Sequence, residues 1–297
     1  MLITPDCVPC ILKMAISGIW KLTDDEELAK ELIIRILQIP ALRGLDWEIT
    51  SPEVVAGVMD RIMEAFHTTD PFRALKEEQN AKGLELYPKL KKLVQASADP
   101  LFTAVNLAIQ GNSIDVMISD HSPDVETTLE EKLRHPIAEK PFLIFREKLK
   151  KTSRLVYLGD NAGEIFFDKV LIETIMAMYN PQIVFVVRGV PALNDVTIQE
   201  AKRVGMDQLV MVMANGIKDA VPGTILSRCS SEFRDMFQES DLIISKGGGN
   251  FDSLEEEKDH SKDITYMLDS KCLPICHYFK SRMHQPILAN AFVRGIV

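Results

Sequence analysis

The sequence has few cysteines and no hydrophobic run long enough to cross a lipid bilayer. Its five cysteines are an odd number in a chain of 297 residues, which argues against a framework of disulfide bonds. The strongest apolar run, Ile183–Val187, has the length of a β-strand. The first ten residues lack the basic segment and apolar core of a signal peptide. We therefore expect a cytoplasmic protein that does not associate with membranes.

The sequence also lacks an excess of positive charge. It has 34 Lys and Arg residues against 43 Asp and Glu residues, a net charge of −9. Such a chain repels a polyphosphate backbone, so nucleic acid is excluded as the expected partner. A small phosphorylated metabolite remains compatible, because one local cation or one metal ion is enough to bind it.

The first part of the chain has the apolar spacing of helices. Apolar residues recur there at intervals of three and four, and no alternating β-rich run is present. Helices are expected to begin near Thr4, Ser51 and Asp99, since each of these capping residues precedes a proline. Residues 1–110 are therefore predicted to form an all-helical domain.

The pattern changes after Lys150, where short β-rich runs alternate with helical patterns. Strands are expected at 155–158, 183–187, 209–212, 242–244 and 264–268. Continuous apolar runs between helices are typical of βαβ units with a parallel sheet. Residues 111–297 are thus predicted to form an α/β domain, and ligands of such sheets bind beyond the carboxyl ends of the strands.

Oxygen-bearing side chains follow the first two predicted strands. Asp160, Asn161 and Glu164 follow the first strand, and Asn194 and Asp195 follow the second. Carboxylate and amide oxygens suit Mg²⁺ or Mn²⁺, with water completing the coordination. Either aspartate alone could be a helix cap, but two of them beside amides at adjacent strand ends favour a metal site.

A glycine-rich segment, 245–250, follows the fourth predicted strand. Backbone N–H groups of Gly247 and Gly249 can surround an anion, together with Asn250, and Lys246 adds a positive charge. The segment matches neither the P-loop nor the dinucleotide fingerprint, which argues against ATP and NAD. The loop 215–224, after the third strand, either folds over this site or is a surface turn.

Four linked motifs resemble the metal-dependent damage-control phosphatases, formerly domain of unknown function eighty-nine. The pair Cys7 and Cys10, and the segment Gly111–Asp115, are similar to the microbial branch of that family. The resemblance spans nearly the whole chain. The motifs are Gly159–Glu164, Asn194–Asp195, Pro222–Thr224 and Ser245–Asn250.

The resemblance implies a helical N-terminal domain and a three-layer α/β/α domain with a mostly parallel sheet. It also implies hydrolysis of phosphate monoesters of small metabolites, such as sugar phosphates and damaged phosphopantetheine, with Mn²⁺, Co²⁺, Ni²⁺ or Mg²⁺. Asp160, Asn161 and Asp195 would be the metal ligands, and Lys246 would hold the phosphate. One departure is Gly248, where the family usually has glutamine, so any contact of that side chain is lost.

Substrate specificity is expected from the helical domain and from the loop after the third strand. The candidate contacts are Asn112, Asp115, Asp219 and Thr224.

These residues fit phosphoryl transfer on chemical grounds. A metal ion would neutralise phosphate oxygens and lower the pKa of water, while Lys246 and the glycine amides stabilise charge. Glu164 or Asp195 would accept the proton of the attacking water. The alternative is a phospho-aspartyl intermediate on Asp160. Haloacid-dehalogenase-type phosphatases have a second aspartate where this chain has Ala162, so we prefer direct attack by water.

Other functions stay open from the sequence. An S-adenosylmethionine-dependent methyltransferase is a rival, because the segment 158–163 faintly resembles a cofactor loop, and a non-catalytic metabolite sensor is another. Two cysteine pairs, Cys7 with Cys10 and Cys272 with Cys276, allow a structural zinc site, a redox pair or inert thiols.

Overall fold

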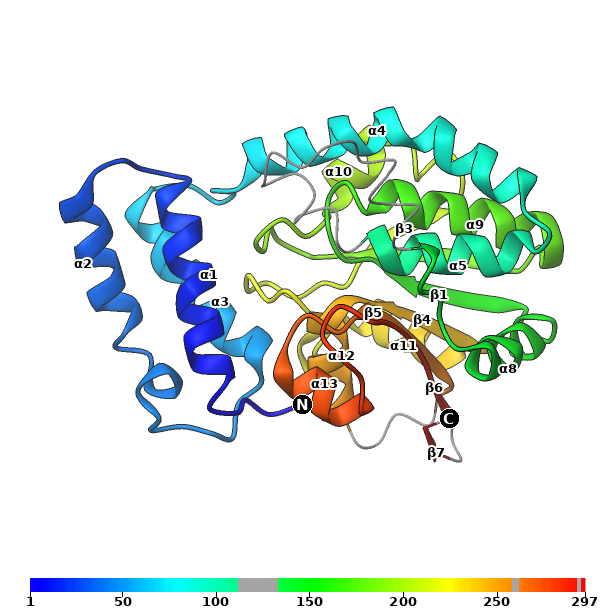
Figure 1. Ribbon diagram of the computed structural model, residues 1–297. Coiled ribbons are helices and arrows are strands. Elements are labelled where there is room, and N and C mark those ends of the chain that lie inside the picture. Colours follow the sequence, from blue (N-terminus) through cyan, green and yellow to red (C-terminus); the bar gives the residue numbers. More distant parts are fainter. Residues whose placement is uncertain (112–132, 258–261, 293–294, 297) are drawn as a thin grey trace.

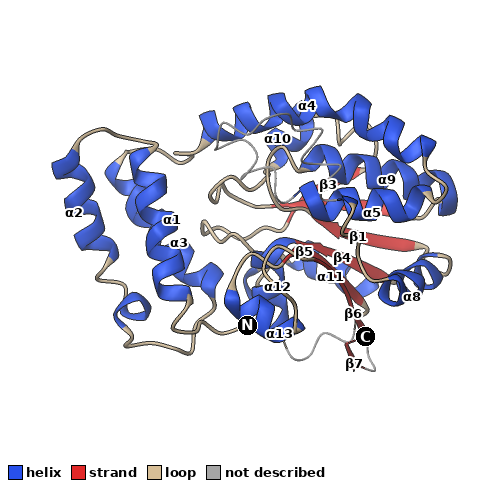
Figure 2. Ribbon diagram, in the orientation of Figure 1, coloured by secondary structure: helices blue, strands red, loops and turns tan. Residues whose placement is uncertain are grey.

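The computed structural model describes residues 1–111, 133–257, 262–292 and 295–296. A seven-stranded sheet lies between two layers of helices, and a further group of helices lies at the N-terminal end (Figures 1 and 2). The strand order is β3-β2-β1-β4-β5-β6-β7. The strands are β1 Arg154–Leu158, β2 Gln182–Val187, β3 Met211–Ala214, β4 Leu242–Lys246, β5 Ile264–Asp269, β6 Pro286–Phe292 and β7 Gly295–Ile296.

The predicted parallel sheet is confirmed. Strands β1 to β5 pair in parallel, whereas β6 runs antiparallel to β5 and β7 antiparallel to β6. Strand β3 begins two residues later than expected, because the amides of Leu209 and Val210 both donate to Met206 O and close a turn. The antiparallel edge was not predicted from the sequence.

Alternate side chains of the strands enter two cores, one on each face of the sheet. Leu155 and Tyr157 of β1 lie in one core, and Val156 and Leu158 lie in the other. The first face is covered by α4 (Arg73–Ala96), α5 (Pro100–Gly111), α8 (Glu139–Leu149), α9 (Ile165–Tyr179) and α10 (Ile198–Arg203). The second is covered by α11 (Ser231–Glu239), α12 (Gly247–Glu255) and α13 (Leu273–Phe279), with the short η2 (Leu226–Arg228) nearby. The α/β/α arrangement is therefore confirmed.

The N-terminal helices form a third core, which also includes Ala192 and Ala220 from the segments after β2 and β3. These helices are α1 (Cys7–Trp20), α2 (Glu26–Ile36), the short η1 (Pro40–Arg43) and α3 (Ser51–Ala65). Helix α1 begins after Asp6 and not at Thr4, so the predicted start there is wrong by two residues.

The cap of α3 is Thr50, one residue before the expected Ser51. Thr50 forms a reciprocal capping box with Glu53, which places the cap where that glutamate can reach back. Asp99 does cap α5, because its Oδ1 accepts from Phe102 N at 3.2 Å. Helical content before residue 112 is thus as expected, with small shifts at two helix starts.

Helices α4 and α5 pack in the same core as the sheet. Leu90 of α4 and Leu101 of α5 lie in the cluster that contains Leu155 of β1. The division at residues 110 and 111 remains a prediction, although these two helices contact the α/β layers directly.

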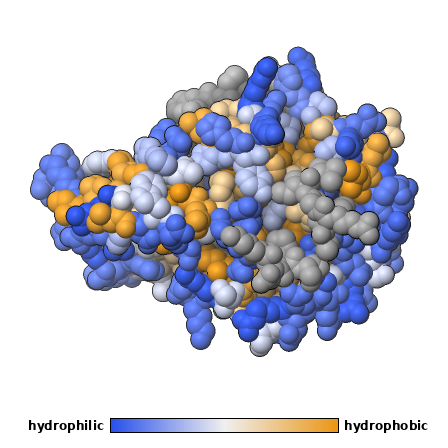
Figure 3. Space-filling view, turned by 90° about the horizontal axis from the view of Figure 1, so that it is seen from below, coloured by the Kyte–Doolittle hydropathy of each residue, from blue (hydrophilic) through white to orange (hydrophobic). Residues whose placement is uncertain are grey.

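An apolar groove of about 470 Å³ lies between α1 and α2. Hydrophobic side chains appear on the surface of this N-terminal part in Figure 3, and Trp20 and Ile34 are 48% and 61% exposed. Apart from Glu26 and Lys30, the groove is lined by apolar residues, so it offers no ligand set for a metal or a phosphate. None of the helices in the described ranges is long and apolar enough to span a membrane.

Candidate active site

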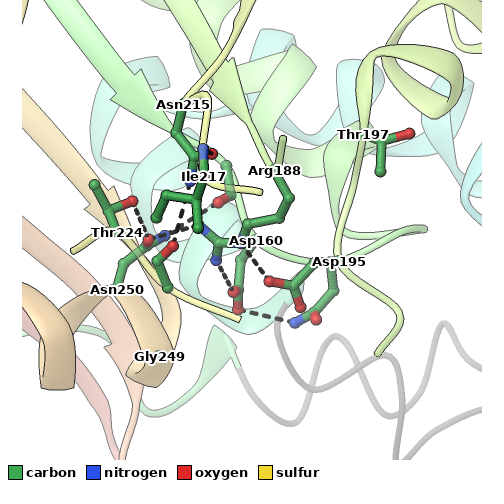
Figure 4. A network of polar contacts seen from close by, with 12 residues as sticks. Asp160, Arg188, Asp195, Thr197, Asn215, Ile217, Thr224, Gly249 and Asn250 are labelled. Carbon is green, nitrogen blue, oxygen red and sulfur yellow. Dashed lines mark hydrogen bonds and ion pairs between the residues drawn. The ribbon is translucent and has the colours of Figure 1, made fainter. Parts of the chain in front are cut away.

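The predicted site residues gather at the carboxyl ends of the parallel strands. The strand order changes direction between β1 and β4, which is where ligands bind in open α/β sheets. The segments after β1, β2, β3 and β4 each send a polar side chain into this region, as Figure 4 shows. These side chains are Asp160, Arg188, Asn215 and Asn250.

The three predicted metal ligands lie together on two loops that are hydrogen-bonded to each other. Asn161 forms an isolated antiparallel bridge with Asp195, and the amide of Val196 donates to Asp160 O at 2.8 Å. The side-chain amide of Asn161 donates to Asp160 Oδ2 at 2.9 Å. Asp160 and Asp195 are buried, and Asn161 is half-buried. The loop backbone therefore fixes the separation of the proposed ligands.

Arg188, which the sequence analysis missed, connects both aspartates. Its Nε donates to Asp195 Oδ2 at 2.5 Å and its Nη2 to Asp160 Oδ1 at 3.3 Å. Its Nη1 donates to Asn250 Oδ1 at 2.7 Å, and the side chain is buried. Its position in the sequence could have indicated this role, since Arg188 directly follows β2. Gly189 comes next, where a Cβ would collide with the backbone of Ile217.

Asn250 joins three of the strand ends. Its Nδ2 donates to Gly159 O at 3.1 Å and to Lys246 O at 2.8 Å, while its Oδ1 accepts from Arg188 and from Thr224 Oγ1. Asn250 and Thr224 are both fully buried. Their predicted phosphate and substrate contacts remain predictions. In this structure both side chains hold the loops together.

Lys246 points toward two carboxylates of the β1–α9 segment. Its Nζ lies 2.5 Å from Glu164 Oε1 and also contacts Asp168 Oδ1, and its side chain is fully buried. Tyr157 Oη donates to the same Asp168 oxygen at 2.7 Å. Burial alone lowers the Lys246 pKa, but the fields of Asp168 and Glu164 outweigh it and raise that pKa above its ordinary value. Phosphate binding by Lys246 remains a prediction that requires it to share these partners.

The buried cluster has more negative than positive charge. Among the described residues, four carboxylates lie with two cations, an excess of two negative charges. Burial, and then Asp195 and Glu164, raise the Asp160 pKa well above its usual range, while Arg188 and Lys246 lower it in part. The carboxylates are Asp160, Glu164, Asp168 and Asp195, and the cations are Arg188 and Lys246.

In the glycine-rich segment, Ser245 and Lys246 are the last residues of β4, and Gly247–Asn250 form the first turn of helix α12. Gly247 has φ +77°, and a Cβ there would collide with the Asp160 carboxylate. A Cβ at Gly249 would collide with Pro222 O. At Gly248 a Cβ would lie 3.2 Å from Ile275 Cδ1, so a larger residue there requires the Ile275 side chain to shift slightly. The helix start directs N–H groups toward the strand ends, as an anion site needs.

Helix α4 contacts both loops that carry the proposed metal ligands, the loop after β1 and the loop after β2. Asn194 Nδ2 donates to Gln79 Oε1 at 3.1 Å, and the amide of Gly163 donates to Asn80 Oδ1 at 2.9 Å. A Cβ on Gly83 would meet Gly163 O at 2.7 Å. Gly83 lies four residues after Gln79 and three after Asn80, so it is on the same side of the helix as both. A helix without a proposed ligand therefore fixes the loops that carry them.

The remaining predicted substrate contacts are Asp219, Asn112 and Asp115. Asp219 is exposed and lies 3.8 Å from Arg228 Nη1. Asn112 and Asp115 lie outside the described residues.

The five cysteines are all free thiols. Within the described part of the chain, no three His, Cys, Asp or Glu side chains are arranged to hold a metal ion. Burial raises the pKa of Cys272, and Cys7 and Cys10 lie close enough to raise it further, so zinc, redox and inert roles of the two cysteine pairs remain predictions. Cys10 is exposed and Cys276 is buried.

Comparisons with known proteins show the family to which the chain belongs. The sequence profile of the damage-control phosphatase ARMT1-like domain matches residues 3–285. An uncharacterized protein of Methanocaldococcus jannaschii is 33% identical, covering 92% of this chain and 90% of that protein. A damage-control phosphatase of Archaeoglobus fulgidus is 31% identical, covering 93% and 94%. A crystal structure of a DUF89 family protein from Pyrococcus horikoshii superposes with a TM-score of 0.82 at 25% identity, covering 97% and 98%. The chain therefore belongs to the damage-control phosphatase ARMT1-like family.

Proposed function

We propose that this protein is a metal-dependent phosphatase that hydrolyses phosphate monoesters of small metabolites. The relatives from Archaeoglobus fulgidus and Pyrococcus horikoshii are named damage-control phosphatases, which supports the reaction class. The observation that carries the proposal is the convergence of Asp160, Asn161 and Asp195 on two hydrogen-bonded loops at the strand ends.

The donor set fits a divalent cation. Asp160, Asn161 and Asp195 offer carboxylate and amide oxygens, which hard divalent ions prefer. With all four carboxylates ionised, the buried cluster has a formal excess of two negative charges, which Mn²⁺, Co²⁺, Ni²⁺ or Mg²⁺ would neutralise. When bound, such an ion supplies Lewis-acid charge that neutralises phosphate oxygens and makes water a better nucleophile.

Other residues of the site would transfer the proton and stabilise charge on the phosphate. Glu164, which is held by Lys246 and by Asn161 Nδ2 at 3.2 Å, would accept a proton from the attacking water. Lys246 and the N–H groups at the start of α12 would stabilise charge on the phosphate.

Direct attack by water is favoured over a phospho-aspartyl enzyme. Both carboxylate oxygens of Asp160 accept hydrogen bonds, Oδ1 from Arg188 and Oδ2 from Asn161. These contacts fix the carboxylate in place, as a metal ligand requires, and they reduce its availability as a nucleophile.

The test is release of inorganic phosphate from a panel of phosphate esters, with EDTA and after adding back each metal. We expect EDTA to abolish hydrolysis and the metals to restore it. Asp160→Ala and Asp195→Ala should each lower the rate by about 10²–10³-fold or more. Asn161→Ala should weaken metal binding less, because it removes no charge. Asp235→Ala, which removes an exposed aspartate of α11, is the matched control.

Undiminished hydrolysis in EDTA, or full activity of Asp195→Ala, would contradict the metal mechanism. Binding of phosphate esters without turnover would point to the sensor instead. Saturable binding of S-adenosylmethionine would point to the methyltransferase.

A further inference from the structure

We propose that Arg188 is the positioning residue of the metal site, holding both aspartate ligands in place before the ion binds. This inference rests on the proposed function, because it assumes that Asp160 and Asp195 are metal ligands. It adds a role for a residue that is not itself a metal ligand.

The contacts of the guanidinium match this role. Three of its nitrogens donate to three acceptors on three different segments, namely Asp195, Asp160 and Asn250. The planar guanidinium has its donors in a rigid arrangement, so these bonds fix both the distance and the relative orientation of the acceptors. Arg188 thus ties the ends of β1 and β2 to helix α12.

The guanidinium donates to Oδ1 of Asp160 and to Oδ2 of Asp195. It therefore orients both carboxylates through one oxygen of each, while Oδ2 of Asp160 accepts from Asn161. Residues that hydrogen-bond to metal ligands without binding the ion keep a metal site preorganised.

Burial makes the arrangement necessary when no ion is bound. Asp160 is 7% exposed, Asp195 2% and Arg188 3%. Two carboxylates at this depth repel each other, and a buried charge without a partner is strongly unfavourable. Arg188 supplies positive charge that lets the carboxylates stay close, so the ligand pair exists in the metal-free protein.

The experiment measures Mn²⁺ affinity by calorimetry, and thermal stability in EDTA, for Arg188→Met and Arg188→Lys. We expect Arg188→Met to weaken Mn²⁺ binding by about 10–100-fold, the usual effect of removing a residue that orients a ligand. Its melting temperature in EDTA should fall, and saturating Mn²⁺ should restore part of the loss. Arg188→Lys keeps the positive charge but loses the planar set of donors. Its Mn²⁺ affinity should therefore lie between those of the wild type and Arg188→Met.

Arg154→Met is the matched control. Arg154 is the first residue of β1, so it lies at the end of the strand opposite the site, and it pairs with the exposed Glu239. It should leave Mn²⁺ affinity unchanged. If Arg188→Met does not fold, Arg188→Lys alone decides the point.

Mn²⁺ affinity in the Arg188 variants equal to or tighter than wild type would overturn the inference, even if the melting temperature fell. The guanidinium would then be only structural, or a competitor of the ion. Mn²⁺ binding without phosphatase activity in the wild type would refute the proposed function but not the role of Arg188. A wild type that binds no Mn²⁺ would refute both.

Discussion

Replacing Lys246 with alanine should destabilise the fold as well as impair catalysis. Lys246, Glu164 and Asp168 are all essentially excluded from solvent, and the lysine contacts both carboxylates. Removing one partner of a buried ion pair leaves uncompensated charge and costs about 3–5 kcal/mol. That is a large part of a typical unfolding free energy of about 5–15 kcal/mol.

The loss should depend on pH in a defined direction. Burial raises the Asp168 pKa to about 6 even with Lys246 present, and without the lysine it should rise further. A carboxyl group with a raised pKa in the folded state contributes stability at low pH that is lost as pH rises through that pKa. Lys246→Ala should therefore be less damaging near pH 5 than near pH 8.

Urea unfolding followed by circular dichroism at both pH values measures this effect. The double variant Lys246→Ala with Asp168→Asn should lose less than the sum of the two single variants, because the residues interact directly. Lys150→Ala removes an exposed lysine that pairs with Glu147, and it should leave the unfolding midpoint close to wild type. A loss below about 1 kcal/mol for Lys246→Ala, or additive single losses, would refute the reasoning. In the folded variant, we expect a higher KM, a lower kcat and nearly unchanged metal affinity.

Three further predictions follow from other parts of the structure. Burial raises the Asp252 pKa from 3.8 to about 6. The contribution of Asp252 to wild-type stability should therefore fall by roughly 2 kcal/mol from pH 4 to pH 7, and Asp252→Asn should remove this part of the pH dependence. An unchanged slope in the variant would mean that Asp252 titrates normally. Cys7→Ser with Cys10→Ser should keep phosphatase activity within a few-fold of wild type, whereas complete loss in a folded variant would place these thiols in the mechanism. Gln79→Ala should weaken Mn²⁺ binding by about tenfold, measured by calorimetry, while the exposed Glu78→Ala should not. Equal affinities in these two variants would show that the loop needs no support from α4.

Most of the parallel strands were predictable because they are short apolar runs buried on both faces. Strand β3 is more exposed, and its start was misplaced. Such runs also locate the strand ends, which is why Asp160 and Asp195 were found from the sequence. The edge strands β6 and β7 were not found, since β6 pairs antiparallel with β5 and β7 pairs antiparallel with β6.

The direction of a side chain at a strand end is harder to predict than its position. Lys246 was expected to face a phosphate, yet its partners lie 82 and 78 residues away in the chain. Arg188 was not selected at all, and its contact with Asn250 spans 62 residues. Local sequence shows that a charge stands at the site, but the folded packing decides which opposite charge it meets.

The close approach of helix α4 to the ligand loops has a consequence for the helix itself. Glycine inside a helix is about 1 kcal/mol less favourable than alanine. At Gly83, however, a Cβ would lie 2.5 Å from Phe166 Cδ2 and 2.7 Å from Gly163 O. Even alanine, the best helix former, would thus push α4 away from the loop after β1. The dimensions of the proposed metal site are therefore set in part by the absence of a methyl group on a helix that contributes no ligand.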